Sequence, residues 1–331
     1  MRHPMPRRRA VQAAAAALAL PRAAVAQVGV TDFPRQTIRI IVPFAGGSGS
    51  DTVARLLASG MKDALGGHPV VVENRSGAGG ITGTEQGARA APDGHTLTMG
   101  TTSSFAANPA LNPRAQYDVA RDFAAVAAVA RAHYAIVTGP GPDAPRTLAE
   151  LVARLKATDA SYASGGVGTI THLCSALFLR QAGAQATHVS YRGSAAALTD
   201  VASGRVLFAS DTLAATIPFI QGGQARPLAV TAPRRVASLP QVPTTGEAGF
   251  PELLVDAWFG VAVPAGTPPA IVAKLSEAAL RGSDTPEIRA RFAALELEPL
   301  ALGPAPFAAL MRDTARFWGE FIRQSGITLS E

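Results

Sequence analysis

Cysteine and aromatic residues are scarce in this sequence. Cys174 is the only cysteine among 331 residues, and Phe, Trp and Tyr together make up 6% of the chain. One thiol cannot form an internal disulfide, so the folded state has to rely on a hydrophobic core. No cysteine lies near the cleavage site of the leader described below, so we expect no lipid anchor there. Cys174 lies among apolar neighbours in a predicted helix, which favours a buried, inert thiol.

The sequence also lacks the short motifs that mark common catalytic and cofactor sites. It contains neither an H-E-x-x-H zinc motif nor a G-x-S-x-G nucleophile elbow. One of the six histidines is in the leader, and none of the others has metal-ligand spacing. The arginines are scattered and are not interleaved with aromatic residues. We therefore expect no metal, no cofactor and no nucleic-acid partner.

The first 26 residues have the composition of an export signal. Three arginines at positions 7–9 form a basic region, and residues 10–20 are an apolar run too short to span a bilayer. The Ala-Val-Ala sequence at 24–26 then fits a cleavage site. We expect residues 1–26 to be a signal peptide and the protein to be periplasmic.

The leader also accounts for most of the excess positive charge. The chain has 30 Lys and Arg against 24 Asp and Glu, and the leader holds five of the arginines and no acidic residue. The remainder is close to neutral, so its charge gives no reason to expect a polyanionic partner. It contains no other apolar run long enough to cross a membrane.

A strand, a glycine loop and a helix follow one another near the start of the remaining chain. Residues 38–42 are a β-branched run typical of a buried strand, residues 46–51 read Gly-Gly-Ser-Gly-Ser-Asp, and apolar residues recur at helical spacing from 52 to 65. Backbone amides in such a loop, together with the helix dipole, can bind a phosphate or a carboxylate. The spacing fits neither a P-loop nor a dinucleotide fingerprint, which lowers the rank of phosphate. A second interpretation stays open: Ser50 or Asp51 caps the helix and the glycines only permit a turn.

Further strand and helix signals alternate along the chain. Residues 69–73 predict a strand before a second glycine-rich loop, and Thr96–Gly100 predict a strand that leads into the hydroxyl cluster at 101–104. Residues 123–130 and 134–138 predict two strands with a break at 131–133. This alternation favours a parallel α/β architecture.

The second half repeats the glycine-loop pattern. The strand at 161–164 enters Gly165-Gly-Val-Gly-Thr169, and helix signals resume at 171–181. The strand at 187–191 precedes Ser194, a predicted N-cap, and the strand at 206–210 ends at Asp211. Strand 258–263 is followed by predicted helices only, which suggests a return to the first half. Two rims of such loops, each beyond the carboxyl ends of parallel strands, would face each other across a cleft.

Seven segments in order carry a family resemblance. They lie at residues 40–51, 72–80, 91–94, 162–173, 191–194, 258–260 and 264–268. In these segments the sequence resembles the Bug family, the extracytoplasmic solute receptors of tripartite tricarboxylate transporters. The resemblance covers essentially the whole chain after the leader. It is silent on the individual ligand.

The resemblance implies an α/β protein with the periplasmic-binding-protein type 2 fold, whose two lobes close on a small mono- or dicarboxylate. It implies a monomer without cofactor that delivers the solute to the membrane subunits of a transporter. Lobe 1 would comprise 27–132 and 257–331, with lobe 2 at 133–256. The implied ligand-binding residues lie on strand-end loops of both lobes: Phe44, Ala45, Gly46, Gly47, Ser48, Ser50, Asp51, Thr101, Ser103, Ser164, Gly165, Gly168, Thr169, His172, Tyr191, Arg192, Gly193 and Asp211.

Several of these residues admit a structural role beside the binding role. Asp51 would repel a carboxylate and is favoured as a helix cap. His172 is either a donor at the cleft or a packing residue, whereas His188, inside a strand, is expected to be structural. Arg192 suits a second carboxylate but is also a common surface residue. The alternative function is an exported α/β hydrolase or nucleotide-dependent enzyme that uses the loops as an anion or oxyanion site.

Overall fold

The computed structural model describes residues 33–327, and the predicted signal peptide lies outside them. From Pro34 onward the chain belongs to one unit. Within residues 33–327 no helix has the length and apolarity needed to cross a membrane.

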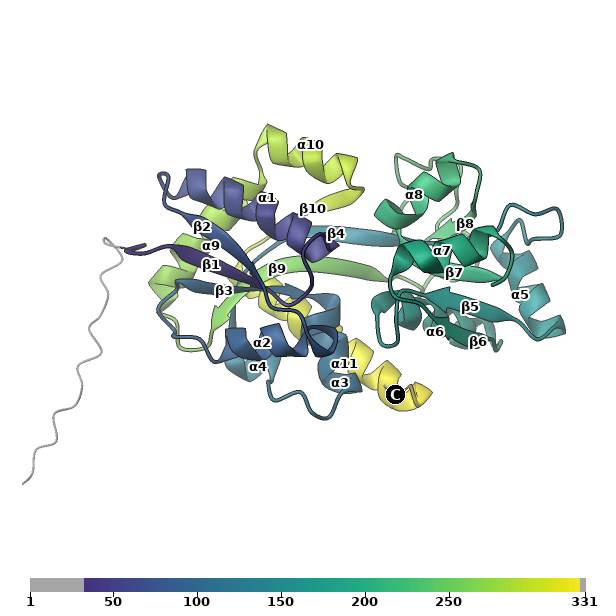
Figure 1. The fold of residues 1–331 in the computed structure, drawn as a ribbon, viewed down its shortest axis with the longest axis horizontal. Helices are drawn as coiled ribbons and strands as arrows, with labels where there is room; N and C mark the ends of the chain where they lie inside the picture. Colours follow the sequence, from purple (N-terminus) through teal and green to yellow (C-terminus); the bar gives the residue numbers. More distant parts are fainter. Residues whose placement is uncertain (1–32, 328–331) are drawn as a thin grey trace, which may run out of the picture. The chain divides into compact units, whose positions relative to one another are not determined.

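The strands form a mixed sheet in the order β2-β1-β3-β9-β4-β7-β5-β6, and β10 and β8 also pair with β4. β1 is parallel to β2 and β3, and β5 is parallel to β6 and β7, whereas β4 is antiparallel to each of its neighbours. Figure 1 shows β4 running from one set of strands to the other. The strands are β1 (Ile38–Val42), β2 (Val70–Asn74), β3 (Thr96–Thr101), β4 (Phe123–Thr138), β5 (Ser161–Ser164), β6 (Thr187–Ser190), β7 (Phe208–Thr212), β8 (Arg226–Val230), β9 (Asp256–Pro264) and β10 (Leu297–Leu302).

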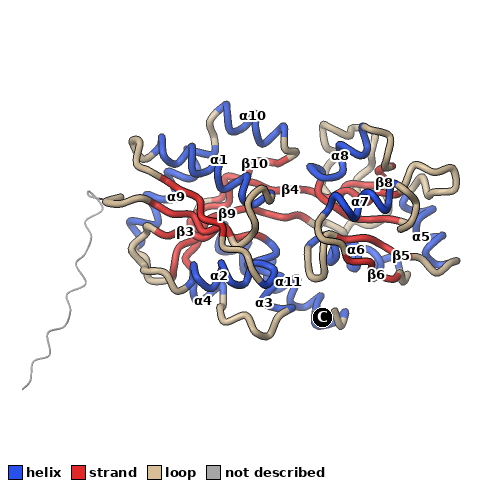
Figure 2. The backbone as a smooth tube through the Cα atoms, viewed as in Figure 1, coloured by secondary structure: helices blue, strands red, loops and turns tan. Residues whose placement is uncertain are grey.

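Helices connect the strands and flank the sheet (Figure 2). Their N-termini repeat one device, because Ser or Thr side chains accept the amide three residues on at α1, α5, α6, α8 and α10. The helices are α1 (Gly49–Ala64), η2 (Ala78–Gly80), α2 (Ile81–Ala88), η3 (Thr102–Ala107), α3 (Asn108–Leu111), α4 (Val119–Asp122), α5 (Leu148–Ala157), α6 (Ile170–Ala182), α7 (Ser194–Ala202), α8 (Leu213–Gln221), α9 (Pro269–Ser283), α10 (Pro286–Ala294) and α11 (Pro304–Ser325).

β4 is one continuous strand of 16 residues, so the predicted break at 131–133 is wrong. The charged residues that suggested a break have partners on neighbouring strands. Arg131 pairs with Asp256 of β9 at 3.1 Å, and His133 pairs with Glu298 of β10 at 2.7 Å. These diagonal cross-strand pairs allow polar side chains inside a long strand without interrupting the ladder.

The strand register brings two rims of loops toward the same stretch of β4. The end of β3 at Thr101 lies opposite Phe259 of β9, which in turn lies opposite Ala130 of β4. The end of β7 at Asp211 lies opposite Ala135 of β4, and β4 lies between β9 and β7 in the strand order. Five residues of strand span roughly 16 Å, so the two sets of carboxyl-end loops are about that far apart along β4.

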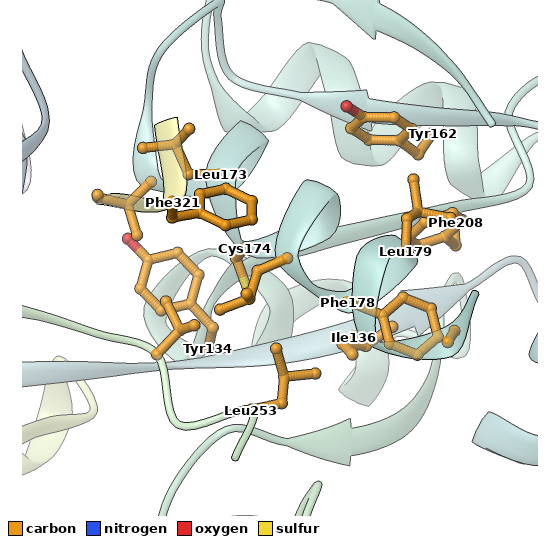
Figure 3. Close-up of a cluster of buried hydrophobic side chains, with 14 of the residues drawn as sticks. Tyr134, Ile136, Tyr162, Leu173, Cys174, Phe178, Leu179, Phe208, Leu253 and Phe321 are labelled. Carbon is orange, nitrogen blue, oxygen red and sulfur yellow. The ribbon is translucent and has the colours of Figure 1, made fainter. Parts of the chain in front are cut away.

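A hydrophobic cluster joins the segments around these rims. It combines side chains of α6 with Tyr134 of β4, Leu253, and Phe321 of α11 (Figure 3). α6 also contacts η3, the helical turn that follows β3. Helix α6 is therefore held close to the segment that follows β3.

Other predicted elements need correction. Strand β10 and helix α8 were not predicted, and β10 contradicts the expectation that only helices follow strand 258–263. The N-cap of α1 is Ser48, not Ser50 or Asp51. Ser194 is the first residue of α7, whose N-cap is Gly193 with φ 106°.

Candidate functional site

The loop between β1 and α1 is fixed from inside by Asp51. Its carboxylate accepts hydrogen bonds from the Gly47 amide at 2.9 Å, from Asn74 Nδ2 at 2.9 Å and from Arg55 Nε at 3.0 Å. The Ser48 hydroxyl accepts the Asp51 amide, which completes the first turn. Asp51 is thus buried and occupied by protein donors, and this arrangement favours its structural role.

Five amides of the same loop have no acceptor within residues 33–327. They belong to Phe44, Ala45, Gly46, Gly49 and Ser50, and the last two lie at the positive end of α1. Ala45, Gly46 and Gly49 are exposed, and Phe44 is half-buried with its carbonyl accepting from Asn74 Nδ2. The loop can therefore offer several N–H donors to an anion, although the amide of Gly47 is committed to Asp51.

The bonds to Asp51 give a pH-dependent stability. Burial alone would raise the pKa of Asp51, but its bonds to Arg55, Gly47 and Asn74 outweigh burial and lower the pKa from 3.8 to about 2. A lowered pKa stabilises the fold above pH 3.8, and this stabilisation is lost as the pH falls toward 2. The shift corresponds to about 2 kcal/mol at neutral pH.

Asp51→Ala should lower the free energy of unfolding by about 2 kcal/mol at pH 7, because the Gly47 amide and Asn74 lose their acceptor. The difference from the wild type should shrink between pH 4 and pH 2. Urea unfolding at several pH values measures it. Glu277→Ala, at an exposed ion pair with Arg281 on α9, is the control and should change little. An equal effect of the two substitutions would contradict the role of Asp51.

Most hydroxyls of the cluster at 101–104, after β3, form hydrogen bonds within the protein. Thr101 and Ser104 form a capping box for η3. Thr102 accepts the Trp258 amide at 3.0 Å and donates to the Asp256 carbonyl. Ser103 is half-buried and its hydroxyl has no partner within residues 33–327. Of the two predicted residues here, Thr101 is a cap and Ser103 keeps a free donor.

The loop between β5 and α6 satisfies its own glycine amides. Gly165 donates to Thr171 Oγ1 at 2.9 Å, Gly166 to Ser164 Oγ at 3.2 Å, and Gly168 to His172 Nδ1 at 3.1 Å. These glycine amides are therefore not free to bind an anion in this structure.

Thr169 performs the capping role in the same loop. It is the N-cap of α6, and its hydroxyl also donates to the Gly166 carbonyl at 2.7 Å. The first-turn amides of Ile170 and Thr171 have no acceptor within residues 33–327. This loop can therefore offer as backbone donors the Val167 amide and the amides of the helix end.

Two histidines stack beside this loop. The rings of His172 and His188 are 3.9 Å apart and nearly parallel, and Tyr162 of β5 stacks on His188 at 5.0 Å. His188 Nε2 is hydrogen-bonded to Ser164 Oγ at 2.7 Å. Burial, and then the neighbouring His188, lower the pKa of His172 to about 4, so its imidazole is neutral at neutral pH.

The loop between β6 and α7 lies against the previous loop, because the Gly193 amide donates to the Gly165 carbonyl at 3.2 Å. Tyr191 is turned to α7, where its hydroxyl donates to Asp200 at 2.7 Å. Arg192 is exposed, and its side chain makes no hydrogen bond or ion pair with the described residues. Arg192 is the guanidinium in this region that remains available to an anion.

Asp211 is deeply buried at the end of β7. Its Oδ1 accepts the Thr212 amide at 2.7 Å, and its Oδ2 has no partner in the part of the chain that the structure describes. Burial raises the pKa of Asp211 to about 6. Because Oδ2 is sealed from solvent, direct contact with a ligand would require local movement.

The predicted residues thus lie on strand-end loops, but only some of them keep hydrogen-bond donors that could contact a ligand. Free donors remain on Phe44, Ala45, Gly46, Ser50, Ser103, His172 and Arg192 within the described residues, while the other predicted residues serve mainly as caps, internal acceptors or turns. Sequence reasoning missed Asn74, which ties β2 to the first loop, and judged His188 structural. Period-2 alternation could have placed His188 on the face of Tyr162, but not in contact with His172.

Comparison with known proteins identifies the family. Residues 53–327 match the model described as tripartite tricarboxylate transporter family receptor. The chain belongs to this family. It is 33% identical over 307 residues to Protein BugT of Bordetella pertussis. The matched region covers 92% of this chain and 94% of that protein.

Solved structures agree with the family assignment. MatC from Rhodopseudomonas palustris with bound malate is 33% identical and has a TM-score of 0.76, covering 88% of this chain and 100% of that chain. R. palustris Rpa4515 with adipate is 30% identical and has a TM-score of 0.78, covering 90% and 99%.

These matches confirm the predicted Bug-family membership and the two-lobed periplasmic-binding-protein fold of α/β type. The family consists of solute-binding receptors, not enzymes.

Proposed function

We propose that this protein is a periplasmic receptor that binds a small mono- or dicarboxylate between two lobes. Lobe 1 comprises residues 27–132 and 257–331, and lobe 2 comprises 133–256. The observation that carries the proposal is the group of amides without acceptors in the loop between β1 and α1, at the N-terminus of α1. The carboxylates bound by MatC and Rpa4515 support the same ligand class.

Neutral donors suit a receptor that must also release its ligand. The amides of Ala45, Gly46, Gly49 and Ser50 bind an anion without a buried cation. Reopening of the lobes then breaks hydrogen bonds to neutral groups and does not separate a buried ion pair. Closure around the ligand gives the membrane subunits of a transporter a distinct form to recognise. Arg192 extends the site toward a second carboxylate.

A thermal-shift assay tests the proposal. Malate, adipate and succinate should each be added to the purified protein, with the uncharged diamide of succinate as the control. A ligand that binds only the native state stabilises it by mass action. At a hundredfold excess over Kd the free energy of unfolding rises by about 2.7 kcal/mol, and the melting temperature rises with it. We expect at least one acid to raise the melting temperature and to be recovered unchanged. Equal shifts with the diamide, or conversion of the acid, would contradict the proposal.

A further inference from the structure

The two rims differ in the backbone donors that they offer. In the loop after β1 several amides have no acceptor, whereas the loop after β5 uses the amides of Gly165, Gly166 and Gly168 internally. On the second side a carboxylate can therefore be bound only by the Val167 amide, by the first-turn amides of α6 and by side chains of the loops there.

The side chain of His172 is placed to supply a donor there. Gly168 N–H donates to Nδ1, so Nδ1 must carry a lone pair and the proton of the neutral ring is on Nε2. Nε2 has no acceptor within residues 33–327. Nε2 is also not one of the fully buried side-chain atoms that lack a hydrogen-bond partner. Since it has no partner, it must be accessible to solvent. The imidazole thus accepts a hydrogen bond from the Gly168 amide at Nδ1 and offers an N–H to solvent at Nε2.

The place of His172 in the fold supports this role. It lies in the first turn of α6, and α6 contacts η3, which begins directly after the Thr101 cap. The donor therefore lies in the first turn of a helix that contacts the segment after β3. Ser103, with a free hydroxyl, lies in the first turn of η3.

His188 fixes the plane of that imidazole. Its ring covers one face of His172 at 3.9 Å with an interplanar angle of 3°, and Tyr162 supports His188 from β5. The hydrogen bond between His188 Nε2 and Ser164 Oγ in turn ties His188 to the loop. His172 and His188 therefore form a stack attached to the loop at Gly168 and at Ser164.

We propose that His172 donates Nε2–H to a carboxylate oxygen of the bound solute, and that His188 is the positioning residue that orients this donor. The inference rests on the proposed function and deepens it. It assigns recognition at the second rim to one neutral imidazole N–H in place of the glycine amides. Because the donor is uncharged, it favours a deprotonated carboxylate without adding a buried ion pair.

Calorimetry on four variants separates donation from positioning. The probe is whichever of malate, adipate or succinate raises the melting temperature of the wild type. His172→Phe keeps a ring in the stack but removes the N–H, and should weaken binding about tenfold or more. His188→Ala removes the stacking face and should weaken binding severalfold, while His188→Phe restores the face and should recover most of the affinity. His68→Phe, on the turn before β2, is the control and should bind like the wild type.

A spectroscopic measurement distinguishes a ligand contact from a structural effect. In ¹⁵N spectra the His172 ring should show a protonated Nε2 and an unprotonated Nδ1, and the Nε2–H signal should shift on addition of the probe. Wild-type affinity in His172→Phe, or an Nε2–H signal unmoved by a probe that binds, overturns the inference while leaving the receptor function intact. Failure of the wild type to bind any of the three acids overturns both.

Discussion

Gly46→Val is expected to weaken carboxylate binding about tenfold or more while leaving the fold nearly as stable as before. Gly46 lies in the exposed loop before α1, and its amide has no acceptor within residues 33–327. A Cβ at this position would meet only Asn74 Oδ1, at an ordinary distance of 3.7 Å, and the backbone does not adopt a positive φ. The branched side chain would therefore obstruct the ligand and not the protein.

Gly46 is a better test position than its neighbour. Gly47 has φ +81° and donates its amide to Asp51, so valine there would strain the backbone and would confuse loss of affinity with loss of stability. Gly141→Val, in a remote turn with no atom within 4 Å of the added Cβ, is the matched control. Calorimetry and thermal melts of both variants make the measurement. Unchanged affinity in Gly46→Val would remove the first loop from the site.

Gly60→Ala should lower the free energy of unfolding by at least about 2 kcal/mol. At Gly60 helix α1 crosses α9 with direct backbone contact. An added Cβ would overlap the Gly282 carbonyl group and lie 2.6 Å from its carbon, while a Cβ at Gly282 would lie 2.5 Å from the Gly60 carbonyl carbon. The helices would have to separate, and that cost exceeds the gain of about 1 kcal/mol from replacing glycine inside a helix.

Gly319→Ala on α11 is the matched control for this effect. Its Cβ would meet only the flexible end of Arg323, at 3.4 Å, so the helix-propensity gain should remain and stabilise the protein by about 0.5–1 kcal/mol. Chemical denaturation of both variants gives the two values. If Gly60→Ala is neutral or stabilising, the close crossing of α1 and α9 is not required for the fold.

The sequence pattern predicted local structure well where short apolar runs lie between turn signals. The strands at Ile38–Val42 and Ser161–Ser164 are confirmed with the predicted residues. Both signals are local, because side-chain alternation depends on neighbouring positions only.

Features that depend on contacts between residues far apart in the sequence could not be predicted. The break predicted at Arg131–His133 failed because Asp256 and Glu298, more than a hundred residues away, satisfy those charges. The close crossing at Gly60 and Gly282 was not predicted either, because it depends on two glycines far apart in the sequence. The site shows the same limit, since the loop sequences do not reveal which amides are already bonded to Asp51 or His172.

Carboxylate capture is tested by native mass spectrometry of the protein purified from the periplasm without refolding. We expect a bound species whose mass matches a small mono- or dicarboxylic acid, present in the wild type and strongly reduced in Gly46→Val. A protein that carries no such acid, and binds none when malate, adipate or succinate is supplied, would contradict carboxylate capture.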